Sequence, residues 1–158
     1  MVYIGIGSNL GNRINNIEKA KYFLDLHGIN ILKTSKYYET LSWPNPNNPR
    51  FINIVVQSST TKSPSKLLDI FKLIEKKLGR LRASRNAPRT CDIDIISYRN
   101  IVTSKGIIIP HKRMIKRNFV LIPLFEIAPF WTHPKNKKDI KELIFSLSIK
   151  DITTIKNL

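Results

Sequence analysis

Residues 80–96, RLRASRNAPRTCDIDII, are the stretch that decides how this chain folds. Their last part opens an apolar, β-branched run, which predicts a strand over residues 90–98. Side chains alternate across a strand, so Asp92 and Asp94 should share one face while Ile93 takes the other. Two carboxylates on one face of an apolar strand repel each other, and burying them without a partner is costly. This stretch therefore predicts a buried strand that carries a paired acidic site.

A divalent cation would offset the repulsion between Asp92 and Asp94, because Mg²⁺ prefers one or two carboxylates completed by water and substrate phosphates. Guanidinium groups bind phosphate oxygens through paired hydrogen bonds. Four arginines precede the acids: Arg80, Arg82, Arg85 and Arg89. Together these residue types predict a site for a polyphosphate. The alternative for the two acids is a solvated strand end bonded to lysines or backbone, and for Arg82 a solvated loop charge.

Outward from this stretch, the residue pattern up to position 98 predicts the order β-α-β-β-α-β. The expected strands cover residues 2–6, 29–38, 51–59 and 90–98, and the expected helices cover 15–26 and 63–78. The glycines and asparagines between positions 5 and 12 predict a turn, and residues 41–49 predict a loop. Further elements are a short strand over 107–110 and helices over 119–127 and 139–147. The expected fold is an α+β, ferredoxin-like βαββαβ core sheet with additional strands and C-terminal helices, in one domain over residues 1–158.

Composition limits the class of protein. The chain has 158 residues, a formal net charge of +16 and one cysteine, which fits a reducing compartment. No apolar stretch approaches the roughly 20 residues that span a bilayer, and the start does not have the pattern of a signal peptide. We therefore expect a cytoplasmic monomer without a membrane partner. The positive charge indicates either an anionic partner or compositional bias towards lysine, and most lysines are spread along the chain.

Residues 85–96, RNAPRTCDIDII, resemble the signature of the 6-hydroxymethyl-7,8-dihydropterin pyrophosphokinases. The constrained positions agree, with Pro88, Arg89, Asp92 and Asp94 in place and aliphatic residues around the acids. The resemblance extends over nearly the whole chain. It includes YIGIGSNLGNR at 3–13, YYETLSWPNPNNPRFIN at 37–53 and PHKRMIKRNFVLIPLFEIAP at 110–129.

The resemblance implies an enzyme of folate biosynthesis that transfers the β,γ-diphosphoryl unit of ATP to the hydroxymethyl group of the pterin and releases AMP. It implies that Asp92 and Asp94 hold two Mg²⁺ ions, and that Arg80 and Arg89 meet the ATP phosphates or steady the transition state. The residues expected to contact ATP are Glu75, Arg80, Arg82, Arg85, Arg89, His111, Lys112 and Arg117. The alternatives are a solvated helix charge for Glu75 and a structural loop residue for His111.

The resemblance also implies a site for a flat pterin ring. Phe51 and Phe119 match the two rings that stack on the pterin, and Asn53 matches the amide that pairs with its edge. Thr40, Leu41 and Trp43 match the loop whose backbone reads the rest of the ring. Ordinary core packing is the alternative for the two phenylalanines.

Two departures from the family pattern bear on ATP contacts. Asn86 stands where many relatives have an aromatic residue, in a loop one residue shorter, and Lys112 stands where an aromatic residue often follows the histidine.

The rival functions are an RNA-binding module and another metal-dependent phosphotransferase or nuclease. The strand at 51–59 lacks the aromatic pattern of RNA-binding sheets, so no nucleic-acid partner is expected.

Overall fold

The structure, a computed structural model, describes residues 1–43, 45–80 and 86–158. The strands are β1 (Val2–Ser8), β2 (Asn30–Thr34), β3 (Tyr38–Thr40), β4 (Phe51–Ser59), β5 (Asp92–Tyr98) and β6 (Lys156–Asn157). The helices are α1 (Arg13–Leu26), α2 (Pro64–Lys77), α3 (Asn118–Ile127), α4 (Ile140–Phe145) and α5 (Ile149–Thr153), with a 3-10 turn η1 (Met114–Lys116). The predicted order of elements through residue 98 is confirmed, except that one expected strand is two.

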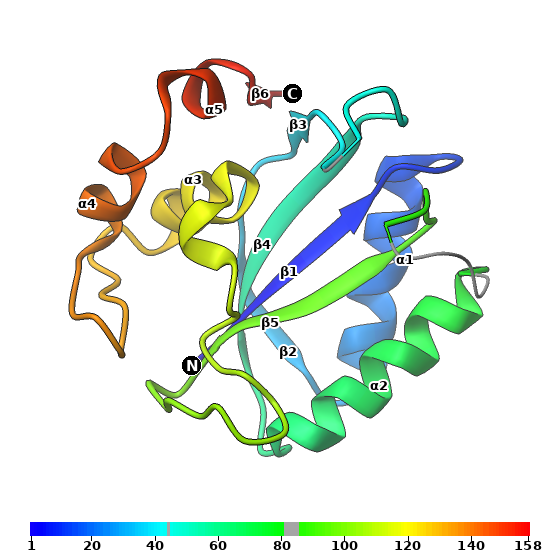
Figure 1. Cartoon of the computed structure of the whole chain (residues 1–158). Helices are drawn as coiled ribbons and strands as arrows, with labels where there is room; N and C mark the ends of the chain where they lie inside the picture. Colours follow the sequence, from blue (N-terminus) through cyan, green and yellow to red (C-terminus); the bar gives the residue numbers. More distant parts are fainter. Residues whose placement is uncertain (44, 81–85) are drawn as a thin grey trace.

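The strands form one sheet in the order β5-β1-β4-β3-β6, and β2 also pairs with β4. Every pairing is antiparallel. Strand β1 therefore lies inside the sheet, between β4 and β5 (Figure 1). This is the predicted ferredoxin-like α+β arrangement, and the segment after β5 adds helices and the edge strand β6.

The two faces of the sheet are covered differently. Helices α1 and α2 cover one face, where a core of aliphatic residues includes Ile4, Ile54 and Ile93. Helices α3 and α4 pack on the other face over a second core that includes Val55 and Ile96, and Figure 1 shows the two helix layers on opposite sides. Asp92 and Asp94 alternate with buried Ile93, as predicted, and lie on the face that carries α3.

Helix α2 begins and ends where the sequence predicts. The Ser63 side chain accepts the backbone N–H of Lys66, and Pro64 occupies the first helical position, where a missing N–H is not needed. Gly79 follows the helix with a φ of +82°, a conformation that glycine adopts without steric cost. Leu78 and Gly79 therefore separate the helix from Arg80, which is the first arginine of residues 80–96.

The strand expected over residues 29–38 is divided into β2 and β3 by Ser35. The Ser35 backbone N–H donates to the carbonyl of Val55 at 3.0 Å, and its hydroxyl accepts the Val55 N–H at 3.0 Å. Because this side chain replaces a backbone carbonyl in the ladder, β2 ends before it and pairing resumes with Tyr38 opposite Asn53. Strand β3 is therefore separate from β2 and leads directly into the loop at 41–49.

Two other predictions were wrong in detail. Gly5 and Gly7 belong to strand β1 and not to the turn that follows it. The expected strand at 107–110 is a single bridge between Thr103 and Ile109. Helix α5 and strand β6 were not predicted. None of the helices within the described ranges is both long enough and apolar enough to span a membrane.

Candidate active site

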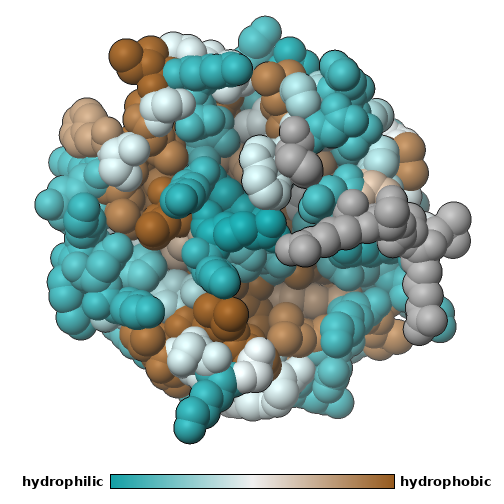
Figure 2. Space-filling model, viewed as in Figure 1, coloured by the Kyte–Doolittle hydropathy of each residue, from teal (hydrophilic) through white to brown (hydrophobic). Residues whose placement is uncertain are grey.

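A cavity of about 280 Å³ opens on the part of the α3 face that the helices leave uncovered. Its walls come from strands β1, β4 and β5, from the loop after β3 and from the segment that leads into α3. Seen from the same side as Figure 1, hydrophilic residues gather over the middle of this face, with hydrophobic residues around them (Figure 2). The cavity therefore combines a polar centre with apolar walls, which is the usual composition of a small-molecule site.

The sequence-predicted residues that line this cavity are Thr40, Leu41, Trp43, Phe51, Asn53, Arg80, Arg89, Asp92, Asp94, His111, Arg117 and Phe119. Glu75 and Lys112 do not line it. Arg82 and Arg85 lie outside the described residues. Elements far apart in the sequence thus bring the expected phosphate-side and pterin-side groups to one place.

Gly5 and Gly7 of strand β1 form the floor of the cavity. Gly5 pairs with Asp94 on β5, and Gly7 pairs with Asp92 on one side and with Asn53 on the other. A Cβ atom on Gly7 would lie 2.6 Å from the Asn53 Oδ1 atom, a separation too short for any side chain to adopt without a shift. The absence of side chains at Gly5 and Gly7 therefore leaves room between the two acids and the amide.

Asp92 lies between two arginines. Its Oδ1 atom accepts hydrogen bonds from Arg80 Nη1 at 2.8 Å and from Arg89 Nη1 at 3.1 Å. Arg80 Nη1 also lies 2.6 Å from Glu75 Oε1 on helix α2, and the Glu75 carboxylate accepts the backbone N–H of Ile93 at 2.8 Å. Burial raises the pKa of Glu75, while the Ile93 N–H and the Arg80 charge act in the opposite direction. Glu75 thus fixes Arg80 and the start of β5 from behind the cavity.

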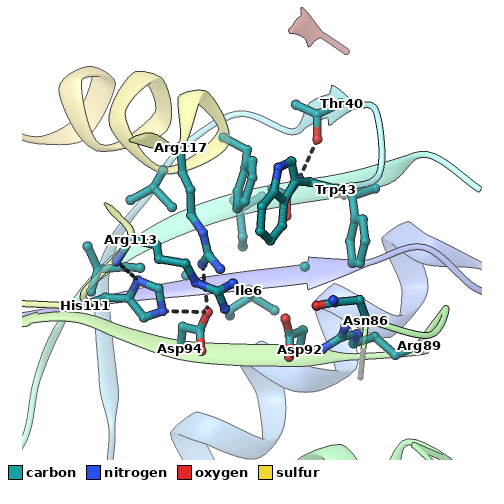
Figure 3. A pocket seen from close by; sticks show the side chains of 18 of the residues that line it. Ile6, Thr40, Trp43, Asn86, Arg89, Asp92, Asp94, His111, Arg113 and Arg117 are labelled. Carbon is teal, nitrogen blue, oxygen red and sulfur yellow. Dashed lines mark hydrogen bonds and ion pairs between the residues drawn. The ribbon is translucent and has the colours of Figure 1, made fainter. Parts of the chain in front are cut away.

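Asp94 faces a second pair of basic side chains. Arg117 Nη1 donates to Asp94 Oδ2 at 3.3 Å, and His111 Nε2 lies 3.8 Å from the same oxygen (Figure 3). The backbone N–H of Arg113 donates to His111 Nδ1 at 3.2 Å, which assigns the ring proton of the neutral histidine to Nε2, the nitrogen that faces Asp94. Burial lowers the pKa of His111, with the Asp94 charge opposing it. His111 is therefore placed to donate a hydrogen bond into the site while neutral.

The two carboxylates fit a magnesium site of the kind that substrate completes. The side chains of Asp92 and Asp94 remain 31% and 39% exposed, so both have oxygens that open on the cavity. Within residues 1–43, 45–80 and 86–158, no group of three or more His, Cys, Asp or Glu side chains could form a full protein cage for a metal. Mg²⁺ commonly takes one or two carboxylates and draws its remaining ligands from water and phosphates. The expectation of two unpaired acids is corrected, because Arg80 and Arg89 pair with Asp92 and Arg117 pairs with Asp94.

The opposite wall of the cavity presents an amide and two aromatic rings. Asn53 is buried, and its Nδ2 atom donates to Thr40 Oγ1 at 3.2 Å, which fixes the amide plane. Phe51 lies two residues earlier on the same face of β4, and Phe119 enters the cavity from α3. A wall of this kind can hold a flat heterocycle by stacking and can read its edge through the remaining amide groups.

Eight of the lining residues were not assigned from the sequence, and Gly5, Gly7 and Arg113 are the three of them that bear on the chemistry of the site. Gly5 and Gly7 could have been recognised from their spacing of two, which matches the spacing of the two acids. Arg113 could have been noticed because it lies between His111 and Arg117, which were both assigned to phosphate.

Comparison with known proteins gives a consistent result. The family model described as 7,8-dihydro-6-hydroxymethylpterin-pyrophosphokinase (HPPK) matches residues 3–129. The chain is 39% identical over 142 residues to a 2-amino-4-hydroxy-6-hydroxymethyldihydropteridine pyrophosphokinase of Aquifex aeolicus, with 89% of this chain and 88% of that protein covered. It is 44% identical over 134 residues to the folic acid synthesis protein fol1 of Pneumocystis carinii, covering 84% of this chain and 18% of that protein.

Solved structures give the same fold. A Plasmodium falciparum HPPK-DHPS solved with pterin and p-hydroxybenzoate aligns with a TM-score of 0.76 at 14% identity, covering 99% of this chain and 46% of that one. The chain thus spans less than half the length of this neighbour and less than a fifth of the Pneumocystis relative, but most of the Aquifex protein. On the family match and the Aquifex identity, the chain belongs to the 7,8-dihydro-6-hydroxymethylpterin-pyrophosphokinase family.

Proposed function

We propose that this chain transfers pyrophosphate from ATP to the hydroxymethyl group of 6-hydroxymethyl-7,8-dihydropterin and releases AMP, a step of folate biosynthesis. In this reaction the pterin hydroxyl oxygen forms a bond to the β-phosphorus, the bond from that phosphorus to the AMP oxygen breaks, and the hydroxyl proton is released. One observation carries the proposal. A single cavity joins Asp92 and Asp94, with their arginines, to the aromatic and amide wall around Asn53.

The pterin end of the site is the wall formed by β4, α3 and the loop after β3. Phe51 and Phe119 would stack on the ring, and Asn53 would pair with its edge because one amide N–H and the Oδ1 lone pairs remain after the bond to Thr40. Thr40, Leu41 and Trp43 would complete the wall through their backbone. Stacking of a heterocycle on one aromatic side chain contributes about 1–3 kcal/mol, so each ring should matter measurably.

The phosphate end of the site is the cationic group around β5. Arg80, Arg89 and Arg117 point at the carboxylates from three segments, and each can turn a guanidinium edge to a phosphate oxygen. His111 would add a neutral N–H donor. The contacts of Lys112, Arg82 and Arg85 with phosphate remain predictions. The contact of Glu75 with ATP also remains a prediction, in addition to the bond that Glu75 makes to Arg80.

Asp92 and Asp94 would hold two Mg²⁺ ions together with the phosphates. Bound there, the metal would neutralise the triphosphate and lower the pKa of the attacking hydroxyl. The arginines then have a double role: they offset the acids when substrate is absent and bind phosphate when it is present. We also propose that residues 1–158 form one pyrophosphokinase domain that acts as a cytoplasmic monomer without a nucleic-acid partner.

Equilibrium titrations test this assignment directly. The purified chain is titrated with the pterin alcohol and with α,β-methylene-ATP, each with and without Mg²⁺, and with a single-stranded RNA as competitor. Mg²⁺ should strengthen binding of the ATP analogue. The pterin should bind at the aromatic and amide wall, which does not include the metal ligands.

Two variants separate the two ends of the site. Phe51→Ala should weaken pterin binding by about tenfold or more and leave the ATP analogue nearly unaffected. Asp94→Ala should weaken binding of the ATP analogue and leave pterin binding nearly unaffected. Tight RNA binding without a response to the pterin would favour the RNA-binding alternative, and nucleotide binding without any pterin response would favour another phosphotransferase.

A further inference from the structure

Arg113 lines the cavity beside the proposed phosphate groups and is not among the residues that the sequence assigned to it. It lies one residue before the turn η1, and its backbone N–H is the donor that fixes the tautomer of His111. Its guanidinium carbon lies 5.4 Å from the centre of the Trp43 ring, within the range of a cation–π contact. Figure 3 shows its side chain extending over the floor of the cavity, next to Arg117 and above Asp94.

The charge of Arg113 is not offset in the way that its neighbours' charges are. Arg80 and Arg89 pair with Asp92, and Arg117 pairs with Asp94. Among the residues that the structure describes, Arg113 has no carboxylate within 4.0 Å. Its contact is instead an aromatic face, which attracts a cation but does not neutralise it.

The surroundings of Arg113 add further positive charge. His111 and Arg117 line the cavity beside Arg113 (Figure 3). Burial lowers the pKa of both His111 and Arg117, and the charge of Arg113 acts in the same direction. Such a cluster is least favourable when nothing is bound and becomes favourable when an anion enters between the groups. The anion that the adjoining metal pair and arginines fit is a polyphosphate.

We propose that Arg113 is an additional phosphate-binding residue for the nucleotide and that Trp43 positions it. The proposal rests on the function proposed above. A guanidinium stacked on an indole keeps its planar edge free for paired hydrogen bonds to a phosphate, whereas a lysine ammonium has no such edge. Trp43 belongs to the loop at 41–49 that would cover the pterin, so one aromatic side chain would link the pterin loop to the phosphate end of the site.

Nucleotide binding in the absence of pterin tests the proposal without turnover. The probe is α,β-methylene-ATP with Mg²⁺, titrated into the full chain. Arg113→Met should weaken its affinity by about tenfold, the size expected for a lost charge-assisted hydrogen bond, and Arg113→Lys should restore only part of it. Arg99→Met is the matched control, because the Arg99 guanidinium also lies over an aromatic ring, that of Tyr98 at 5.1 Å, but does not line the cavity, and this variant should bind as the wild type does.

The role of Trp43 is tested in the same titration. Trp43→Leu should weaken nucleotide affinity about two- to fivefold, and Trp43→Phe should restore most of it because the ring face is kept. The Leu substitution should have little further effect in the Arg113→Met background, since the two residues would act as one unit.

Wild-type-like affinity of a folded Arg113→Met chain would overturn the proposal, and so would an equal loss in Arg99→Met. Circular dichroism and thermal unfolding show whether each variant is folded. Failure of the proposed function gives a different result, namely a wild type that binds nucleotide but releases no AMP in the presence of the pterin.

Discussion

Asn9 and Arg89 are joined by two hydrogen bonds across 80 positions of sequence. The backbone N–H of Arg89 donates to Asn9 Oδ1 at 2.7 Å, and the backbone N–H of Asn9 donates to the Arg89 carbonyl at 3.1 Å. Asn9 is only 2% exposed, and its Nδ2 atom also donates to Ser42 Oγ at 3.2 Å and to the Pro49 carbonyl at 3.1 Å. One buried side chain thus ties the turn after β1 to both the loop at 41–49 and the segment that carries Arg89.

Asn9→Ala should therefore affect both ends of the site. It removes one acceptor and two donor contacts and leaves buried partners unsatisfied, so we expect a loss of about 2 kcal/mol in the free energy of unfolding. Both KM values should rise, because both segments lose a common anchor. Asn16→Ala is the control, since among the described residues the side-chain amide of Asn16, on α1, bonds only to Ser8 and Leu10, at the end of β1 and in the turn after it. Urea unfolding and steady-state kinetics measure the two effects, and unchanged KM values in a folded Asn9→Ala chain would contradict this reading.

Gly7→Ala should weaken pterin binding in particular. The added methyl group would meet the Asn53 amide oxygen at 2.6 Å and displace the group that is proposed to read the pterin edge. Gly5→Ala is the comparison, because its methyl group would meet only the Ile96 side-chain end, at 3.2 Å. We expect the KM for pterin to rise about tenfold or more in Gly7→Ala, corresponding to a lost amide contact, and distinctly less in Gly5→Ala. Equal effects of the two substitutions would count against the role of Asn53.

Glu75→Gln should show how much the Glu75 carboxylate contributes to the position of Arg80, as distinct from the stability of the fold. Glutamine can still accept the Ile93 N–H, but it no longer offers Arg80 a charged partner. We expect the free energy of unfolding to fall by about 1 kcal/mol and the KM for ATP to rise severalfold, because Arg80 is no longer held towards the cavity. Glu142→Gln, in the capping box of α4, is a control far from the site. A severalfold rise in the KM for ATP in that control as well would argue against a specific contact.

The contact between Tyr38 and Glu126 predicts a dependence of stability on alkaline pH. The Tyr38 hydroxyl donates to Glu126 Oε2 at 2.9 Å, and burial together with this carboxylate raises the pKa of Tyr38 to about 12. A pKa raised above its ordinary value of 10.0 gives stability that is present below pH 10 and lost as the pH rises towards 12. Tyr38→Phe should be less stable at pH 8 and should lose part of the decline between pH 10 and 12. Because the pKa of Tyr37 is also raised to about 12, Tyr37→Phe should be measured in parallel by urea unfolding.

The part of the fold that the sequence predicted is the part that local rules determine. The alternation of Asp92, Ile93 and Asp94 indicated the two faces of β5, and Ser63 with Pro64 marked the start of α2. The division of the strand at 29–38 was not predictable from pattern alone, because it depends on Ser35 meeting Val55 across the sheet. Helix α5 has a local start signal that the prediction did not use, namely Ser148, whose side chain accepts the Asp151 N–H.

Most of the predicted residues line the cavity, but Glu75 and Lys112 do not, and the pairing of the charges was not predictable. The signature around residues 85–96 indicated the acids and arginines, and the resemblance supplied the pterin wall. Which arginine meets which acid depends on how α2, β5 and the segment before α3 converge, and sequence spacing does not give that. Arg113 and Asn9 were missed as site residues for the same reason, since the side-chain contacts that show their roles are with distant segments.

The most direct measurement is AMP release by the purified chain from ATP and 6-hydroxymethyl-7,8-dihydropterin. The wild type should form AMP and pterin diphosphate in equal amounts, only when both the pterin and Mg²⁺ are present. Asp94→Ala should lower this rate by at least about a hundredfold, whereas Asp69→Ala, an exposed acid on α2, should not change it. Full turnover by Asp94→Ala, or release of ADP in place of AMP, would contradict the assignment of the paired acids.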